Sequence, residues 1–248
     1  MFPTPYFRAC EENNRDISVM RIPDRHYGLH PIPAWLISLL MAGLGGWVIG
    51  TVFDLGENYG FLAQIAGLFL AAPLLMQLLT PIMRVAGLYK YYSPLFLVFG
   101  ESKKRMEIHS GPSIDYLLHL RGIAPGKELQ RTVLAYYLQG LLNIADKVAA
   151  SENPAAVEIV GTSYFFSDRS VERMGFEVSP GGWFHRINLM FNFLELFLLN
   201  SLAAGKVDVP NIFKVKKARM NGERLLEHRQ YIQRLYERMA TERNRAWE

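Results

Sequence analysis

The chain has 248 residues, half of them hydrophobic, and a formal net charge of +4 at pH 7. This length suits one large domain or two small ones, and the apolar content is high without being that of a protein embedded in a membrane throughout. Its single cysteine, Cys10, excludes an intrachain disulfide and a metal site built from cysteines.

The N-terminal third contains two uncharged apolar runs, Ala34 to Phe53 and Tyr59 to Met83, behind a polar and proline-rich arm over 1–33. Each run is long enough to cross a hydrocarbon core of about 30 Å as a helix. A core helix of a soluble protein is the alternative for either run alone, but two in succession favour a membrane. We therefore predict a transmembrane hairpin over 34–83.

The charges around this hairpin predict its orientation. Asp54 and Glu57 lie between the runs without any Lys or Arg, whereas basic residues flank the hairpin on both sides. Because Lys and Arg are retained in the cytoplasm, we expect both termini on the cytoplasmic side of the inner (plasma) membrane.

Small residues recur at four-residue intervals in the first run, at Ala42, Gly46 and Gly50. Such a stripe allows close approach of another helix. The partner is either the second run of the same hairpin or a second copy of the chain, which leaves a homo-oligomer open.

The region after Pro94 alternates between two periodicities, which predicts a cytoplasmic α/β domain over 94–205 with parallel neighbouring strands. Asp115 could equally begin a helix within the third predicted strand, and Gly175 stops the short second helix. The predicted strands are 95–99, 105–109, 114–120, 156–166 and 176–178, and the predicted helices are 126–150 and 168–174.

Two segments are predicted to contact the membrane or a partner. Trp183 to Ala204 is apolar but carries a polar stripe, so we expect an amphipathic helix on the interface or against the domain. The segment 206–248 is predicted to be a basic amphipathic helix, with ten Lys and Arg against five Glu after residue 213. Anionic lipid is its favoured partner, no nucleic-acid partner is expected, and apolar residues at seven-residue spacing (Leu225, Ile232, Met239) leave a protein partner open.

Residues 116–178 resemble the core of the GNAT superfamily of acyl-CoA-dependent N-acyltransferases. The matching features are a loop that reaches Pro125, a helix from Gly126, an apolar strand over 157–166, and the ending Glu172-Arg173-Met174-Gly175-Phe176-Glu177. That ending is similar to the family's Glu-Lys-Leu-Gly-Phe-Glu. The resemblance implies a GNAT-like α/β fold, acyl-CoA as the cofactor, and acyl transfer to an amine.

The resemblance also implies an acyl-carrier site at the start of the long helix. Gly126 would let the pyrophosphate approach the backbone N–H groups, and Lys127 and Arg131 would add positive charge. Further glycines of the family pattern are absent around Leu129, Arg131 and Val133, and the family's proton-donating tyrosine is replaced by Val171.

The candidate catalytic residues are His119 and Tyr164. A histidine can act as a general base near neutral pH, and Tyr164 follows Gly161 in a strand placed to line a substrate pocket. His109, Asp115 and His185 are further candidates, but their spacing matches no compact metal-ligand motif, so no metal is expected.

Two functions of different classes follow from these features. One is a membrane-anchored protein whose acyltransferase-like domain acylates a membrane-associated amine. The other is a non-catalytic membrane scaffold or interaction subunit that keeps the fold and uses its basic tail to bind lipid or a partner.

Overall fold

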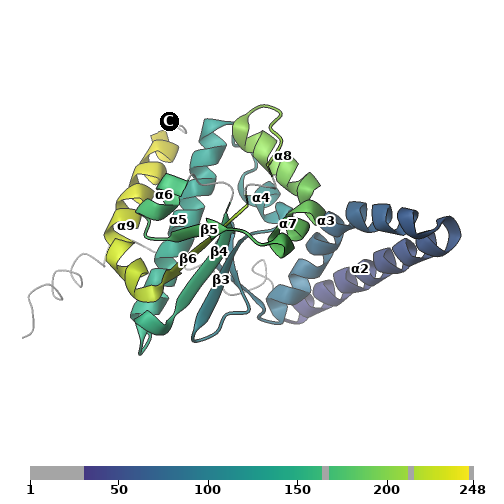
Figure 1. Cartoon of the computed structure of the whole chain (residues 1–248), viewed down its shortest axis with the longest axis horizontal. Helices are drawn as coiled ribbons and strands as arrows, with labels where there is room; N and C mark the ends of the chain where they lie inside the picture. Colours follow the sequence, from purple (N-terminus) through teal and green to yellow (C-terminus); the bar gives the residue numbers. More distant parts are fainter. Residues whose placement is uncertain (1–30, 164–167, 212–214, 246–248) are drawn as a thin grey trace, which may run out of the picture.

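The structure is a computed structural model that describes residues 31–163, 168–211 and 215–245. Most of the predicted arm over 1–33, and the candidate catalytic residue Tyr164, lie outside the described residues. A helical hairpin projects from one side of a mixed α/β domain (Figure 1).

The hairpin consists of α2 (Pro31–Tyr59) and α3 (Phe61–Val85), which pack against each other along their length. Both helices have the length and apolar composition needed to cross a membrane. Their most apolar stretches are only 17% and 22% buried within the fold, which is unlike the burial of a soluble core helix. Gly60 joins them with a φ of 88°, a value that favours glycine.

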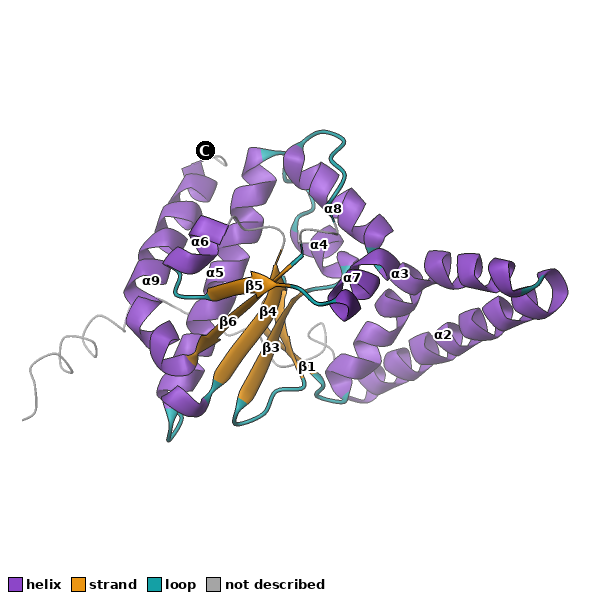
Figure 2. Ribbon diagram, viewed as in Figure 1, coloured by secondary structure: helices purple, strands orange, loops and turns teal. Residues whose placement is uncertain are grey.

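The domain is built on a six-stranded sheet in the order β1-β2-β3-β4-β6-β5 (Figure 2). Only β3 and β4 pair in parallel; every other neighbouring pair described is antiparallel. The strands are β1 (Tyr89–Ser93), β2 (Phe96–Phe99), β3 (Arg105–Ser110), β4 (Glu158–Ser163), β5 (Glu177–Pro180) and β6 (Lys216–Asn221).

The prediction of parallel neighbours throughout is therefore wrong. β6 lies between β4 and β5, so the strand that follows the Gly-Phe ending does not pair with β4. The residues of β6 were expected to be part of the basic amphipathic helix predicted over 206–248. Their alternation is that of a strand with one solvent face, since Ala218 and Met220 are buried while Arg219 between them is exposed.

One face of the sheet is covered by α5 (Lys127–Ala149) and α9 (Gly222–Arg245), which lie side by side (Figure 1). Leu138 and Ile144 of α5 meet Leu225 and Ile232 of α9 and Ile159 of β4 in the main core, all fully buried. The apolar residues at seven-residue spacing in the tail thus pack inside the chain. The segment predicted as a separate helix over 206–248 contributes β6 and α9 to this fold.

Four shorter helices complete the domain: α4 (Ser113–His119), α6 (Asp168–Arg173), α7 (Trp183–Phe191) and α8 (Phe193–Ala204). The strand predicted over 114–120 is wrong, because α4 occupies it; the alternative of a helix near Asp115 is the one the structure adopts. The single helix predicted over 183–204 is two helices that meet at Asn192, whose backbone leaves the helical region.

Candidate functional site

The two parallel strands part before they end. β3 pairs with β4 from Arg105–Glu158 to Ile108–Gly161 and no further. β3 nevertheless stays paired with β2 through Ser110, and β4 with β6 through Ser163. The carboxyl ends of β3 and β4 are therefore separated by an opening in the sheet, and carboxyl ends of parallel strands are where α/β sheets usually bind ligands.

A small cavity of ≈ 70 Å³ lies at this opening. His109 and Ser110 line it from β3, Gly161 and Thr162 from β4, and Tyr137 from α5. Further apolar lining residues are Leu138, Leu141, Val171, Met174 and Phe176. The cavity admits a narrow group rather than a whole cofactor.

Gly161 is required where the strands are still paired. A Cβ atom at this position would lie 2.5 Å from Ile108 Cγ1, closer than real Cβ atoms approach. The last paired position before the opening therefore has room only for glycine.

Tyr137 places a neutral phenol at the cavity wall. Its hydroxyl lies 3.0 Å from the Tyr116 hydroxyl, and burial raises its pKa even though hydrogen bonds to Tyr116 and Ser110 oppose the shift. A buried phenol held in this way keeps its proton at neutral pH and can donate it.

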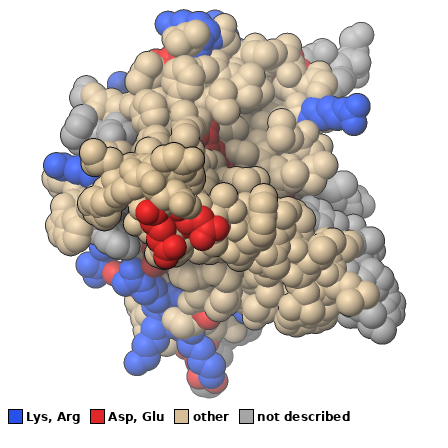
Figure 3. Space-filling model, turned by 90° about the vertical axis from the view of Figure 1, so that its right-hand side faces the viewer, with Lys and Arg blue, Asp and Glu red and all other residues tan. Residues whose placement is uncertain are grey.

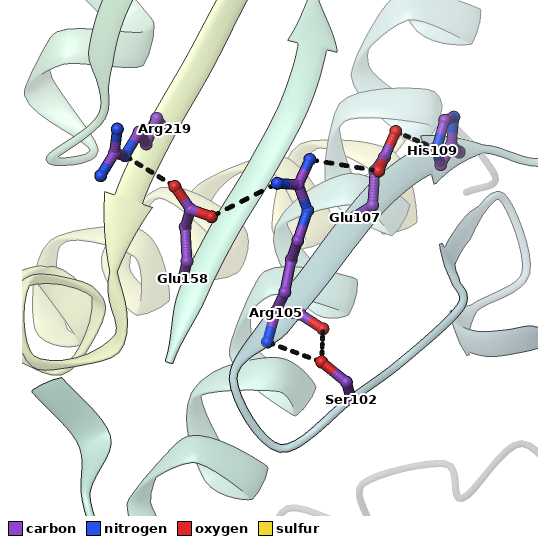
Figure 4. Close-up of polar contacts among 6 residues, drawn as sticks. All are labelled: Ser102, Arg105, Glu107, His109, Glu158 and Arg219. Atoms are coloured by element: carbon purple, nitrogen blue, oxygen red, sulfur yellow. Dashed lines mark hydrogen bonds and ion pairs between the residues drawn. The ribbon is translucent and has the colours of Figure 1, made fainter. Parts of the chain in front are cut away.

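His109 ends a row of charged side chains that crosses β6, β4 and β3 (Figure 4). Glu158 lies 2.8 Å from Arg219 Nε and 3.5 Å from Arg105 Nη1. Arg105 Nη2 also lies 3.5 Å from Glu107, whose other oxygen is 3.4 Å from His109 Nε2. These residues alternate with buried ones along the strands, so they occupy the sheet face opposite α5 and α9.

Burial lowers the pKa of His109, and the nearby Glu107 carboxylate only partly opposes this. The Nε2 atom is itself buried and has no hydrogen bond of good geometry among the described residues. A neutral imidazole at pH 7 is the form that a general base needs.

The predicted catalytic residue His119 lies elsewhere. It is the last residue of α4, exposed, with its ring 6.4 Å from that of Tyr136. Partial burial and the positive charge of Arg84 lower its pKa. His119 is not among the residues that line the opening between β3 and β4.

The predicted cofactor-binding residues lie at the start of α5. Gly126 precedes the first turn with a φ of 103°, and its N–H donates to Leu202 O at 3.0 Å. Lys127 and Arg131 are exposed on the first two turns and do not line the cavity at the opening between β3 and β4. Gly205, which ends α8, abuts Gly126, since a Cβ there would lie 3.2 Å from Gly126 Cα.

Ser110 and Thr162 were not among the residues predicted from sequence, and His109 was only a secondary candidate. His109 ends the strand predicted over 105–109, and Thr162 follows Gly161 in the next predicted strand. The signal that could have identified them is their common place at the carboxyl ends of two strands that are connected through helices.

A second polar cluster joins the hairpin to the domain. The Arg84 guanidinium of α3 lies 4.4 Å from the centre of the Tyr91 ring, and the Tyr91 hydroxyl donates to Asp115 Oδ2 at 2.7 Å. Asp115 is 1% exposed, and burial raises its pKa to about 6 against the opposing effects of Tyr91 and Arg84. The junction thus contains a buried carboxyl that titrates near neutral pH.

Within the part of the chain that the structure describes, no group of three or more His, Cys, Asp or Glu side chains is placed to hold a metal ion. No family model, curated protein or solved structure matches the chain. We take the opening between β3 and β4, which His109, Ser110, Thr162 and Tyr137 line, as the candidate functional site.

Proposed function

We propose that the chain is a membrane-anchored acyltransferase that holds acyl-CoA at the opening between β3 and β4 and acylates a membrane-associated amine. The observation that carries this proposal is the early end of the β3–β4 pairing at Ile108 and Gly161, between two parallel strands that are connected through α4 and α5. The β4 side of the opening and the helix α5 lie within residues 116–178, which resemble the GNAT superfamily, whereas β3 precedes that segment.

The opening suits the extended arm of acyl-CoA. Amide groups of that arm can hydrogen-bond to a strand edge in the way that an added peptide strand does. The resemblance places the phosphates at the start of α5, where the helix dipole, Lys127 and Arg131 favour anions. The thioester then lies beside the cavity between the two strands.

The chain has groups for both proton transfers of the reaction. The amine nitrogen attacks the thioester carbonyl carbon, a C–N bond forms, the C–S bond breaks, and neutral His109 accepts the proton that the amine loses. The departing thiolate takes a proton from the Tyr137 hydroxyl, a role that Val171 cannot fill. Because His109 and Tyr137 lie on opposite faces of the sheet, base and acid flank the reacting carbon.

The hairpin would place this chemistry at a membrane surface. We propose that α2 and α3 span the inner membrane with both termini in the cytoplasm. The charge pattern supports this, since the α2–α3 connection carries only acidic side chains. The basic helix α9 lies on the side of the domain away from the hairpin (Figure 1), so this arrangement does not bring it to the same bilayer.

Cysteine labelling in intact cells tests the orientation. In a Cys10→Ser background, we expect Glu57→Cys to react with a membrane-impermeant maleimide and Lys206→Cys to react only after lysis. External labelling of Lys206→Cys would show that the orientation is inverted.

A non-catalytic scaffold is the second candidate, and one observation favours it. The Gly126 N–H is already bonded to Leu202, and α8 ends against the start of α5, where the resemblance puts the phosphates.

Calorimetric titration of acetyl-CoA into the full chain in lipid nanodiscs distinguishes the two functions. The acyltransferase proposal predicts saturable binding that Lys127→Ala and Arg131→Ala weaken, more strongly at low salt, because exposed charges are then less screened. A scaffold shows no binding heat in the parent chain, and that result would remove the acyltransferase proposal.

A further inference from the structure

A second and much larger cavity lies between α4, α5 and α8. Its volume is ≈ 630 Å³, within the range of roughly 300–1,000 Å³ typical of small-molecule sites. Most of its lining is aliphatic, including Leu120, Leu129, Val133, Leu199 and Ala203. An apolar cavity of this size matches an apolar ligand better than a charged one.

The cavity opens through exposed leucines. Leu117 of α4 and Leu198 and Leu202 of α8 line it and are 67%, 60% and 44% exposed. On α8, Leu194 precedes Leu198 and Leu202 at four-residue spacing, so these exposed leucines share one helix face. The helix α7 adds the exposed side chains of Trp183, Ile187 and Met190. Exposed apolar side chains gathered on one helix face mark an interaction site.

This surface lies on the side of the domain from which the hairpin projects (Figure 1). Viewed from that side, uncharged surface surrounds a patch of Asp and Glu near the centre, and Lys and Arg gather at the margin (Figure 3). Uncharged surface with a basic margin is the pattern expected of a domain that rests on an anionic bilayer.

A polar clamp fixes the hairpin to the two helices beside the mouth. Gln77 of α3 accepts from the Ile114 N–H at 3.1 Å and donates to Glu195 of α8 at 3.4 Å. Glu195 in turn accepts from the Ser113 N–H at 2.8 Å and from the Ser113 hydroxyl. This clamp therefore holds the mouth of the cavity toward the bilayer that the hairpin would cross.

We infer that the cavity takes up a fatty acyl chain of a phospholipid from the bilayer. The occupant follows from continuity, because the exposed leucines at the mouth join the cavity to the surface that faces the membrane. Tyr137 lies on the wall of both cavities, so the lipid chain ends beside the opening between β3 and β4. The inference shares the membrane anchor with the proposed function but does not require acyl transfer.

Photolabelling tests the inference on the full chain in nanodiscs. The probe is phosphatidylcholine with a diazirine at the end of one acyl chain, and labelled peptides are mapped by mass spectrometry. We expect labels on α5 and α8 around Leu129, Val133 and Leu199, in addition to those on the hairpin. Labels confined to α2 and α3 would overturn the inference, as would labelling of the cavity by a diazirine acyl-CoA added from solution but not by the lipid.

Two variant pairs separate the cavity from the surface around it. Ala203→Phe fills the cavity and should reduce its labelling by about tenfold, whereas Ala204→Phe, next on the same helix but outside the lining, should not. Leu198→Glu puts a charge at the mouth and should also reduce labelling, whereas Val207→Glu, exposed just beyond α8 and outside the lining, should not. Because Leu198 is exposed, we expect Leu198→Glu to fold. The second pair therefore still tests the inference if Ala203→Phe fails to fold.

Equal labelling in Leu198→Glu and the parent chain would overturn the inference. Acetyl-CoA calorimetry on the same samples distinguishes this failure from that of the proposed function, since acyl-CoA can bind at the opening whether or not a lipid chain fills the second cavity.

Discussion

Replacing His109 by alanine is expected to lower the rate of acyl transfer by about 10²–10⁴-fold, the usual contribution of a general base. The affinity for acyl-CoA should stay close to that of the parent chain, because in the proposed mechanism the imidazole acts on the amine and not on the carrier. The measurement is release of the CoA thiol by the full chain in nanodiscs that contain phosphatidylethanolamine as the amine.

His119→Ala is the matched control for this experiment. His119 is exposed and does not line the opening, so its loss should change the rate by no more than about twofold. The parent rate should be level at neutral pH and fall only below the lowered pKa of His109, where the base becomes protonated. A large loss in His119→Ala together with none in His109→Ala would return the base to the residue predicted from sequence.

Replacing Asp115 by asparagine is expected to remove a pH-dependent loss of stability. Burial raises the pKa of this carboxyl from 3.8 to about 6, so the folded chain binds more protons than the unfolded chain between these values. The free energy of unfolding contributed by Asp115 is therefore fully present below the lower value and lost as pH rises through about 6. The loss amounts to roughly 2–3 kcal/mol.

Denaturant unfolding of the full chain in detergent micelles at acid and neutral pH measures this difference. The quantity compared between variants is the change of the unfolding free energy with pH. Glu101 contributes to this change with the opposite sign. Burial raises the pKa of Glu101, but Lys147, Tyr92 and Lys90 outweigh burial and lower it. Tyr91→Phe is the matched control: it removes the hydrogen bond that lowers the Asp115 pKa in the folded chain, so the loss should extend to higher pH and become larger. An unchanged slope in Asp115→Asn would show that the carboxyl does not titrate as argued.

Several elements follow from local properties of the sequence. The helices α2 and α3 are evident from length and hydropathy, and α5 from the spacing of residues such as Val133, Leu141 and Val148. The strand β3 is likewise bounded nearly as expected. In each case the deciding interaction is burial of one face, which the sequence pattern records directly.

The opening and the larger cavity depend on contacts between distant segments, so local patterns could not reveal them. The opening exists because β3–β4 pairing stops at Gly161, while β6, some fifty residues later, keeps β4 extended. The larger cavity needs α4 and α8, which are about eighty residues apart and are linked through Ser113 and Glu195. The base candidate shifted from His119 to His109 for the same reason, since only the sheet register places a side chain at the opening.

Hydrogen exchange on the full chain in nanodiscs, with and without acetyl-CoA, tests the central claim most directly. If the carrier lies between the parted strands, the ligand should slow exchange of backbone amides in the segments from His109 to Gly111 and from Thr162 to Ser163. The interior of α9, remote from the opening, should exchange at the same rate in both samples. Saturating acetyl-CoA that leaves both strand ends unchanged, or that protects only segments away from them, would contradict the account.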